Sequence, residues 1–134
     1  MSFHFISSPY SGTDEQREER ARITAEVCGK LLRRDFHVIS PAVHSHTITK
    51  AVHFTDEERR SLILDFGLSL LRKASSMIVL EIEGWERSFG VQAEIALCHE
   101  LGIPVKYLKP SELTDCADPK IIFKSEPSSL AQIQ

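Results

Sequence analysis

The feature that most constrains the fold is an uninterrupted apolar run of strand length, Met77-Ile78-Val79-Leu80. A strand with one solvated face alternates apolar and polar side chains, whereas a central strand of a parallel sheet is covered on both faces and is apolar throughout. The run therefore predicts a central strand with helices packed on both sides of the sheet.

The segments around this run alternate between strand and helix patterns. Short apolar segments bounded by Pro, Gly and Ser indicate strands, and apolar residues at helical spacing behind Thr, Asp or Ser indicate helices. Such alternation implies a parallel sheet with right-handed crossovers. We predict an α/β fold of three layers (α/β/α), with a flavodoxin- or Rossmann-like parallel sheet of four to five strands. The expected strands are residues 3–7, 36–40, 77–80, 104–108 and, as a fifth, 121–123; the expected helices are 14–34, 55–74 and 89–101; residues 41–55 are expected to be a long irregular connection.

Length and composition exclude several classes of protein. The 134 residues fit one domain, residues 1–134, whose pattern becomes less regular from about residue 109. The start of the chain does not resemble a signal peptide, and no apolar run approaches the roughly 20 residues of a membrane span. Three cysteines without metal-site spacing fit a reducing cytoplasm. A net charge of −3 and a pI near 6.1 argue against nucleic-acid binding. We expect a cytoplasmic protein that binds neither nucleic acid nor membrane.

The helix expected at 55–74 has two apolar arcs, and a sheet can cover only one of them. We assign the second arc to a partner subunit, which predicts a homodimer or a larger homo-oligomer. Asp65 lies on the narrow polar strip between the arcs. The first arc contains Leu62, Ile63, Phe66 and Leu70, and the second contains Leu64, Leu68 and Leu71.

In a parallel sheet the ligand crevice lies at the carboxyl ends of the strands, which here are followed by residues 7–12, 41–46 and 82–94. In the last segment Ser88 can cap the next helix, and Gly90 lets a ligand approach free backbone N–H groups that favour an anion. Glu94 lies about 60° from Val91 on the helix, within the apolar arc that contains Ile95. A carboxylate placed on a buried face is costly, so we interpret Glu94 as functional.

Several short motifs of the chain resemble those of a known protein family. Ser-Pro-Tyr at 8–10, Ser-x-Gly-Val-x-x-Glu at 88–94 and Leu-Gly-Ile-Pro-Val at 101–105 resemble the nucleoside 2-deoxyribosyltransferase superfamily, over about residues 3–108. Ser-Pro-Tyr-Ser, His-Ser-His at 44–46 and the extended motif at 84–94 resemble an uncharacterised bacterial branch, a domain of unknown function. That branch implies a fold but no established substrate.

The resemblance implies a reaction and a set of site residues. The carboxylate matching Glu94 attacks the anomeric carbon of a nucleoside or nucleoside 5′-monophosphate, and a glycosyl ester forms while the base leaves. A tyrosine matching Tyr10 helps position the glutamate, and Ser88 and Gly90 match groups that hold the phosphate. The activity implied is that of an N-glycosidase or deoxyribosyltransferase, which needs no cofactor or metal. Further substrate contacts are expected from Ser8, Ser11 and Arg17.

The chain departs from the superfamily pattern in one important place. An aspartate near the leaving base is usual on the helix before the third strand, but Gly67 occupies that spacing here. Asp65 is two residues away, about 200° around the helix, and is either a displaced catalytic group or an ordinary solvated residue. An alternative hypothesis is a catalytically silent nucleotide-binding or sensor module. A structural or interaction protein is a third hypothesis, but it must explain Glu94.

Three other side chains have competing interpretations. His44 and His46 are either part of a substrate-contacting loop or ordinary loop histidines. With His53 they could be zinc ligands, but no third ligand has diagnostic spacing, so we predict no metal. Trp85 either stacks a base at the mouth of the pocket or packs in the core.

Overall fold

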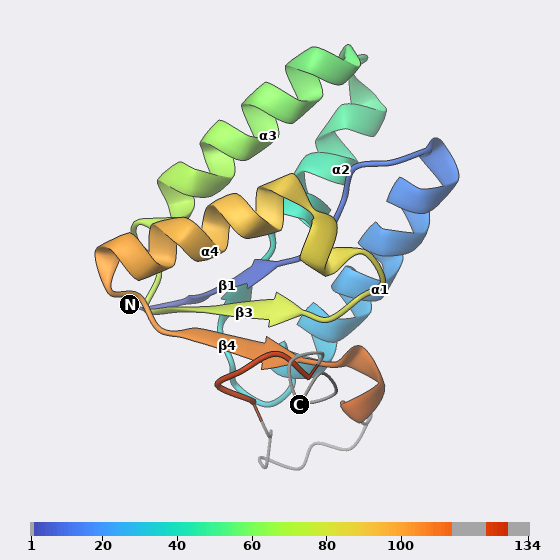
Figure 1. Ribbon diagram of the computed structural model, residues 1–134. Helices are drawn as coiled ribbons and strands as arrows, with labels where there is room; N and C mark the ends of the chain where they lie inside the picture. The colour runs from blue at the N-terminus through green and yellow to red at the C-terminus, as the bar shows by residue number, and fades with distance from the viewer. Residues whose placement is uncertain (1, 114–122, 129–134) are drawn as a thin grey trace.

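The computed structural model describes residues 2–113 and 123–128, and its centre is a four-stranded parallel sheet (Figure 1). The strand order is β2-β1-β3-β4, and all three strand pairs are parallel. This confirms the predicted α/β fold with a parallel sheet. The strands are β1 (His4–Ser7), β2 (Val38–Ile39), β3 (Ser76–Leu80) and β4 (Val105–Leu108).

Helices cover both faces of the sheet (Figure 1). Met77 and Val79 of β3 pack in one core cluster with residues of α3 and α4, whereas Ile78 and Leu80 pack in the other cluster with residues of α1. All five residues of β3 are buried, which confirms the central strand. The helices are α1 (Asp14–Leu32), α2 (Pro41–Ala51), α3 (Asp56–Leu71) and α4 (Phe89–Leu101); η1 (Trp85–Arg87) and η2 (Pro110–Glu112) are single 3₁₀ turns.

The helix ends follow local sequence signals. Thr13 and Thr55 each accept a hydrogen bond from the third backbone N–H of their helix, and the glutamine or glutamate at that third position bonds back to form a capping box. Ser88 caps α4, and Gly102, with a φ of 73°, ends it in the left-handed region. These caps agree with the helix starts predicted at 14, 55 and 89.

The predicted irregular connection after residue 41 is wrong, because residues 41–51 form helix α2. Ser40 accepts a hydrogen bond from the Val43 N–H, and Pro41 occupies the first turn, where its missing N–H costs nothing. The helix packs against α1 and α3. His44 and His46 therefore lie on a helix rather than in an extended loop.

The assignment of the two arcs of α3 was also wrong. Leu68 and Leu71 of the second arc pack in the core, whereas Leu62 and Phe66 of the first arc are 52% and 42% exposed. Gly67 is buried beside the second arc, and the absence of a side chain there lets α3 approach the sheet closely. The exposed apolar side chains of α3 are therefore those of Leu62 and Phe66.

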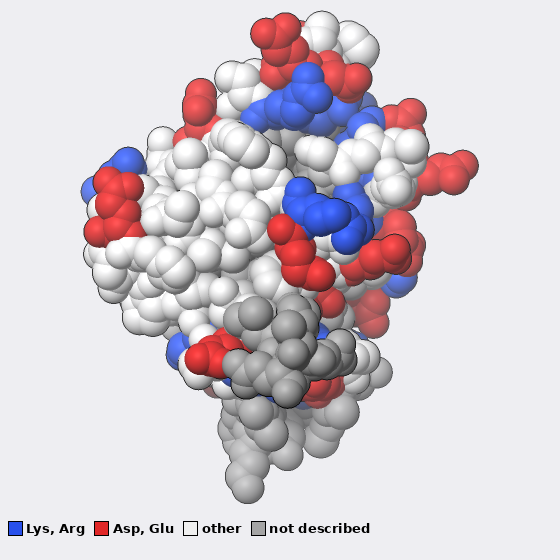
Figure 2. Space-filling view, viewed as in Figure 1, with Lys and Arg blue, Asp and Glu red and all other residues white. Residues whose placement is uncertain are grey.

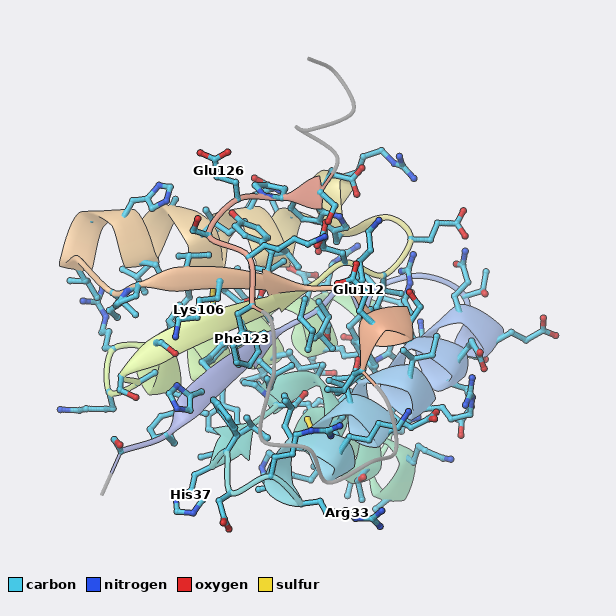
Figure 3. The ribbon with its side chains drawn as sticks, turned by 90° about the horizontal axis from the view of Figure 1, so that it is seen from below. Arg33, His37, Lys106, Glu112, Phe123 and Glu126 are labelled. Atoms are coloured by element: carbon cyan, nitrogen blue, oxygen red, sulfur yellow. The ribbon has the colours of Figure 1, made fainter. Side chains whose placement is uncertain are left out.

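Residues 123–128 lie along the outer strand β4. Lys124 and Tyr107 form an isolated antiparallel bridge, and the Lys106 ammonium lies 5.6 Å from the centre of the Phe123 ring (Figure 3). Most of the fifth strand predicted at 121–123 falls outside the described residues. Within the described part of the chain, no helix has the length and apolar character needed to cross a membrane.

Candidate active site

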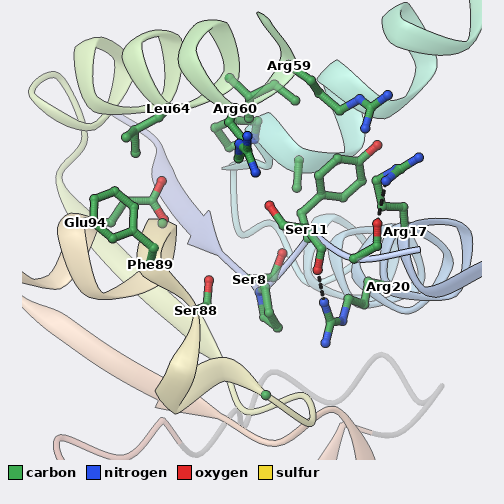
Figure 4. Close-up of a pocket in the computed structure, with 18 of the residues that line it drawn as sticks. Ser8, Ser11, Arg17, Arg20, Arg59, Arg60, Leu64, Ser88, Phe89 and Glu94 are labelled. Carbon is green, nitrogen blue, oxygen red and sulfur yellow. Dashed lines mark hydrogen bonds between the residues drawn. The ribbon is translucent and has the colours of Figure 1, made fainter. Parts of the chain in front are cut away.

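A cavity of about 890 Å³ opens at the carboxyl end of β1 (Figure 4). This volume lies within the range of small-molecule sites. Its walls come from the segment after β1, from the N-terminal half of α3, and from the segment that leads into α4. Of the predicted site residues, the lining contains Ser8, Tyr10, Ser11, Arg17, Ser88, Gly90 and Glu94.

The half-buried Glu94 carboxylate is held by a residue that the sequence analysis did not identify. Ser7, the last residue of β1, is buried and donates its hydroxyl to Glu94 Oε1 at 2.7 Å. Burial raises the pKa of Glu94 to about 7, and the Ser7 hydrogen bond partly opposes this shift. A carboxyl group with this pKa is ionised in part at neutral pH and is a stronger nucleophile than an ordinary carboxylate.

Gly67 on α3 lies directly against this carboxylate. A Cβ atom added at Gly67 would be 3.3 Å from Glu94 Oε2, tighter than an ordinary contact. Gly67, where the resemblance led us to expect an aspartate, therefore lies against the candidate nucleophile and carries no acid.

Tyr10 lines the cavity, but its hydroxyl does not bond to Glu94. It lies 2.7 Å from His46 Nδ1, and His46 Nε2 lies 2.8 Å from Glu18 Oε2. The expectation that Tyr10 orients Glu94 directly is therefore corrected, because Ser7 makes that bond. His46 bonds to the Tyr10 hydroxyl but does not itself line the cavity.

The start of α4 supplies a polar edge and an aromatic rim. Ser88 accepts a hydrogen bond from the Val91 N–H at 3.3 Å, and its own hydroxyl proton remains available to a ligand. Gly90 follows within the first turn, where backbone N–H groups favour an anion. Phe89 is 78% exposed and lines the cavity, a role that the sequence analysis missed.

Arginines dominate the charge of the lining. Figure 2 shows Lys and Arg side chains on two sides of a hollow in the surface, and Figure 4 shows Arg60 reaching from α3 toward the space between Glu94 and Ser11. Five arginines and three carboxylates give the lining a formal charge of +2 when Glu94 is ionised. The arginines are Arg17, Arg20, Arg59, Arg60 and Arg87, and the carboxylates are Asp56, Glu57 and Glu94.

The five arginines differ in whether their guanidinium groups already have a partner, and within the described part of the chain only Arg17 and Arg59 are paired with a carboxylate. Arg60 and Arg87 form no ion pair among the described residues, so their guanidinium groups are available to a ligand. The other three have partners: Arg17 bonds to Asp14, Arg59 bonds to Asp56 at 3.1 Å, and Arg20 bonds to the Ser11 carbonyl.

Besides His46, three predicted site residues lie outside the cavity lining. Asp65 is exposed on α3, so the structure does not bring it to Glu94. Trp85 is 7% exposed and packs in the core, with its ring 5.7 Å from that of Tyr107. His44 is exposed and packs against the Phe66 ring. No three His, Cys, Asp or Glu side chains among the described residues form a group that could hold a metal ion.

Comparison with known proteins places the chain in a family. The fold is similar to that of a 2-deoxyribosyltransferase from Bacillus psychrosaccharolyticus, with a TM-score of 0.60 and 18% identity, over 81% of this chain and 73% of that chain. At this identity the similarity shows the fold alone. No curated protein matches the chain. Residues 3–109 match the family described as a domain of unknown function, DUF1937, in the nucleoside 2-deoxyribosyltransferase-like clade. The chain therefore belongs to the DUF1937 family.

Proposed function

We propose that this protein cleaves the N-glycosidic bond of a nucleoside 5′-monophosphate, as an N-glycosidase or a deoxyribosyltransferase, with Glu94 as nucleophile. The observation that carries the proposal is the position of Glu94. Its carboxylate is held by Ser7 on the wall of an arginine-lined cavity at the carboxyl end of a parallel sheet. This is where α/β folds of this type bind ligands.

In the proposed reaction, a Glu94 oxygen attacks the anomeric carbon and the base leaves, so that a glycosyl ester forms. Water resolves the ester in hydrolysis, and a second base resolves it in transfer. The Ser7 hydroxyl bonds to one carboxylate oxygen and leaves the other to attack. Because each step inverts the anomeric carbon, the product keeps the configuration of the substrate.

The charge of the lining favours a phosphorylated substrate over a free nucleoside. A phosphate monoester carries about −1.5 to −2 charges at neutral pH, which complements the +2 of the lining. Ser88 and Gly90 at the start of α4 are the proposed phosphate contacts, together with the hydroxyls of Ser8 and Ser11. Arg60 and Arg87, which form no ion pair among the described residues, are the proposed charged contacts, and Arg20 adds to the positive charge because its partner is a neutral carbonyl.

The similar fold of the Bacillus psychrosaccharolyticus 2-deoxyribosyltransferase supports this class of substrate. That enzyme is a biocatalyst for the synthesis of nucleosides. The exposed apolar residues Leu62 and Phe66 support a homo-oligomer of this chain, which light scattering in solution tests directly.

A second candidate function is a nucleotide-binding module without turnover. The observation that favours it is the absence of an acid at Gly67, combined with the exposed position of Asp65 away from the cavity. Such a module would bind nucleotides through the same arginines and release no base.

The test is incubation with a panel of nucleosides and 5′-monophosphates, with free base measured by chromatography. Glu94→Gln tests the nucleophile, and Glu100→Gln is the matched control because Glu100 is an exposed carboxylate on the same helix. We expect the parent and Glu100→Gln to release base and Glu94→Gln to be inactive. Nucleotide-dependent stabilisation of the parent without base release would instead support the binding module.

A further inference from the structure

A series of hydrogen bonds connects the cavity with the protein surface. The Tyr10 hydroxyl bonds to His46 Nδ1 at 2.7 Å, and His46 Nε2 bonds to Glu18 Oε2 at 2.8 Å. Glu18 also accepts from the Lys50 ammonium at 3.2 Å. The His46 side chain is 14% exposed and that of Glu18 is 61% exposed, so the series runs from the cavity wall to solvent.

We propose that Tyr10 donates a proton to the leaving base, and that His46 and Glu18 are positioning residues that supply and orient this proton. The inference rests on the proposed function, because only a departing base needs such a proton. It assigns Tyr10 the task that an aspartate performs in the superfamily pattern.

Glu18 determines which His46 nitrogen carries a proton. Its hydrogen bonds to His46 and Lys50 lower the pKa of Glu18, so the carboxylate is ionised and can only accept. His46 Nε2 is therefore a donor. When Nδ1 is also protonated, it donates to the Tyr10 oxygen, and the Tyr10 O–H is free to bond to a ligand. When Nδ1 is unprotonated, Tyr10 donates to it and can only accept from a ligand.

Protonation of the departing base requires a proton donor in the cavity. The other acidic side chains nearby are ion-paired, exposed or outside the lining. A base that departs with the electron pair of the broken C–N bond leaves faster when it is protonated. Gly67 has no acid to give, and Asp65 is outside the lining. Asp56 is paired with Arg59, and Glu57 is exposed. Tyr10 is the acid in the described lining that has a second proton donor bonded behind it.

The first step balances without any external reagent. A Glu94 oxygen forms the bond to the anomeric carbon, and the C–N bond breaks with its electron pair on the base nitrogen. The base takes the Tyr10 O–H proton, and the Tyr10 oxygen takes the proton from His46 Nδ1. His46 becomes neutral, still donating its Nε2 proton to Glu18.

The second step returns the proton. Water enters the position that the base has left and attacks the anomeric carbon, and the bond to Glu94 breaks with its electron pair on the carboxylate. The water proton passes to the Tyr10 oxygen, and the Tyr10 proton passes to His46 Nδ1. The same groups therefore act first as acid and then as base, as microscopic reversibility requires in a retaining mechanism.

The groups that face His46 favour this cycle. Tyr10 faces it from the segment after β1, Glu18 and Arg22 from α1, and Lys50 from its own helix. Arg22 is bonded to two other glutamates of α1, Glu19 and Glu26. Among the described residues, Glu18 is therefore the one carboxylate bonded to the imidazole, and its hydrogen bond keeps Nε2 as the donor.

The experiment compares two substrates that differ in whether the leaving group needs a proton. One is the nucleotide that the parent cleaves in the panel. The other is the 4-nitrophenyl glycoside of the same sugar phosphate, whose nitrophenolate leaves unprotonated. We expect Tyr10→Phe and His46→Gln to lower kcat/KM, which reports the step in which the leaving group departs, about 100-fold on the nucleotide, but to change it less than about threefold on the nitrophenyl substrate. His99→Gln, an exposed histidine of α4, is the control for both.

Glu18→Gln provides a second readout that a purely structural role would not change. The substitution removes the carboxylate that accepts from His46 Nε2 and thereby fixes which imidazole nitrogen carries the proton. We therefore expect Glu18→Gln to lower kcat/KM on the nucleotide and to leave kcat/KM on the nitrophenyl substrate unchanged. Melting temperatures of all variants identify any that fail to fold.

The outcomes separate this inference from the proposed function. If Glu94→Gln abolishes cleavage of both substrates while Tyr10→Phe and His46→Gln slow both equally, the relay is wrong and the proposed function stands. An equal effect of folded Glu18→Gln on kcat/KM of the two substrates also overturns the relay. If the parent cleaves neither substrate, the proposed function and the relay fail together.

Discussion

The hydroxyl of Ser7 donates to Glu94 Oε1 at 2.7 Å, a bond between residues 87 positions apart in the chain. It joins the carboxyl end of β1 to the second turn of α4 and determines where the candidate nucleophile points. Because Ser7 is buried and the carboxylate is half-buried, each group depends on the other for its hydrogen bond.

Ser7→Ala is expected to raise the pKa of Glu94 above about 7, because the bond that stabilises the carboxylate is lost. A hydrogen bond to a charged group contributes about 1.5–3 kcal/mol, equivalent to roughly one to two pH units. The low-pH limb of kcat/KM should move upward by about that amount. Ser76→Ala is the matched control, since Ser76 is a buried serine of the neighbouring strand that bonds to His4. An unchanged limb in Ser7→Ala would show that the bond does not act on Glu94.

Glu94 is expected to make folding stability depend on pH. Its folded-state pKa of about 7 lies above the ordinary value of 4.5, so the folded protein binds this proton more tightly than the unfolded chain. The stabilisation from the protonated form is present below about pH 4.5 and is lost as the pH rises through 7. Glu94→Gln should therefore be more stable than the parent at pH 8, by up to about 3 kcal/mol, and equal to it near pH 4. Urea unfolding at both pH values measures this, and a difference independent of pH would contradict it.

Gly67→Ala is expected to reduce activity with little loss of stability. The added methyl group would meet Glu94 Oε2 at 3.3 Å and push the carboxylate from its position, while alanine favours the helix by about 1 kcal/mol. Gly29→Ala is the matched control, because a Cβ at Gly29 within α1 meets nothing within 4 Å. We expect the control to keep full activity, as measured by base release. Full activity in Gly67→Ala as well would mean that this contact does not constrain Glu94.

Arg60→Gln and Arg87→Gln are expected to weaken binding of the phosphorylated substrate. A charge-assisted contact is typically about 1.5–3 kcal/mol, so KM should rise roughly 10- to 100-fold for the 5′-monophosphate and little for the free nucleoside. Arg72→Gln, at the exposed end of α3, should change neither value. Equal increases of KM for the two substrates would argue against a phosphate contact.

Alanine substitutions at Phe89 and Trp85 are expected to have opposite effects, the first on KM and the second on the free energy of unfolding. Phe89→Ala should leave the free energy of unfolding within about 0.5 kcal/mol, because the ring is 78% exposed, and should raise KM if the ring covers a bound base. Trp85→Ala should cost about 3–5 kcal/mol, because the ring is buried in the core. Denaturant unfolding and steady-state kinetics of both variants test this contrast. A stable Trp85→Ala protein with a raised KM would restore the original interpretation of Trp85 as a base-stacking residue.

Local patterns in the chain were sufficient to predict the α/β architecture. The apolar run at 77–80 predicted a doubly covered strand, and the helix starts followed Thr13, Thr55 and Ser88. These features depend on residues within a few positions of one another, through side-chain alternation, helical spacing and capping. The same kind of pattern singled out Glu94, because three residues from Val91 is a short, fixed angle on a helix. Helix α2 was missed because its start at Pro41 also resembles a turn, and because the contacts that stabilise it come from α1 and α3.

Only the tertiary structure decided which side chains contact one another in the candidate site. Ser7 and Glu94, and Tyr10 and His46, are 87 and 36 positions apart, and Gly67 reaches Glu94 from another helix. The sequence by itself determined the strands and helices other than α2, and it identified one costly carboxylate. The order β2-β1-β3-β4 and the crossovers decided which hydroxyl holds that carboxylate and which arginines line the cavity around it. The physical reason is that hydrogen bonds and burial depend on distance in space, and chain folding, rather than sequence spacing, sets that distance.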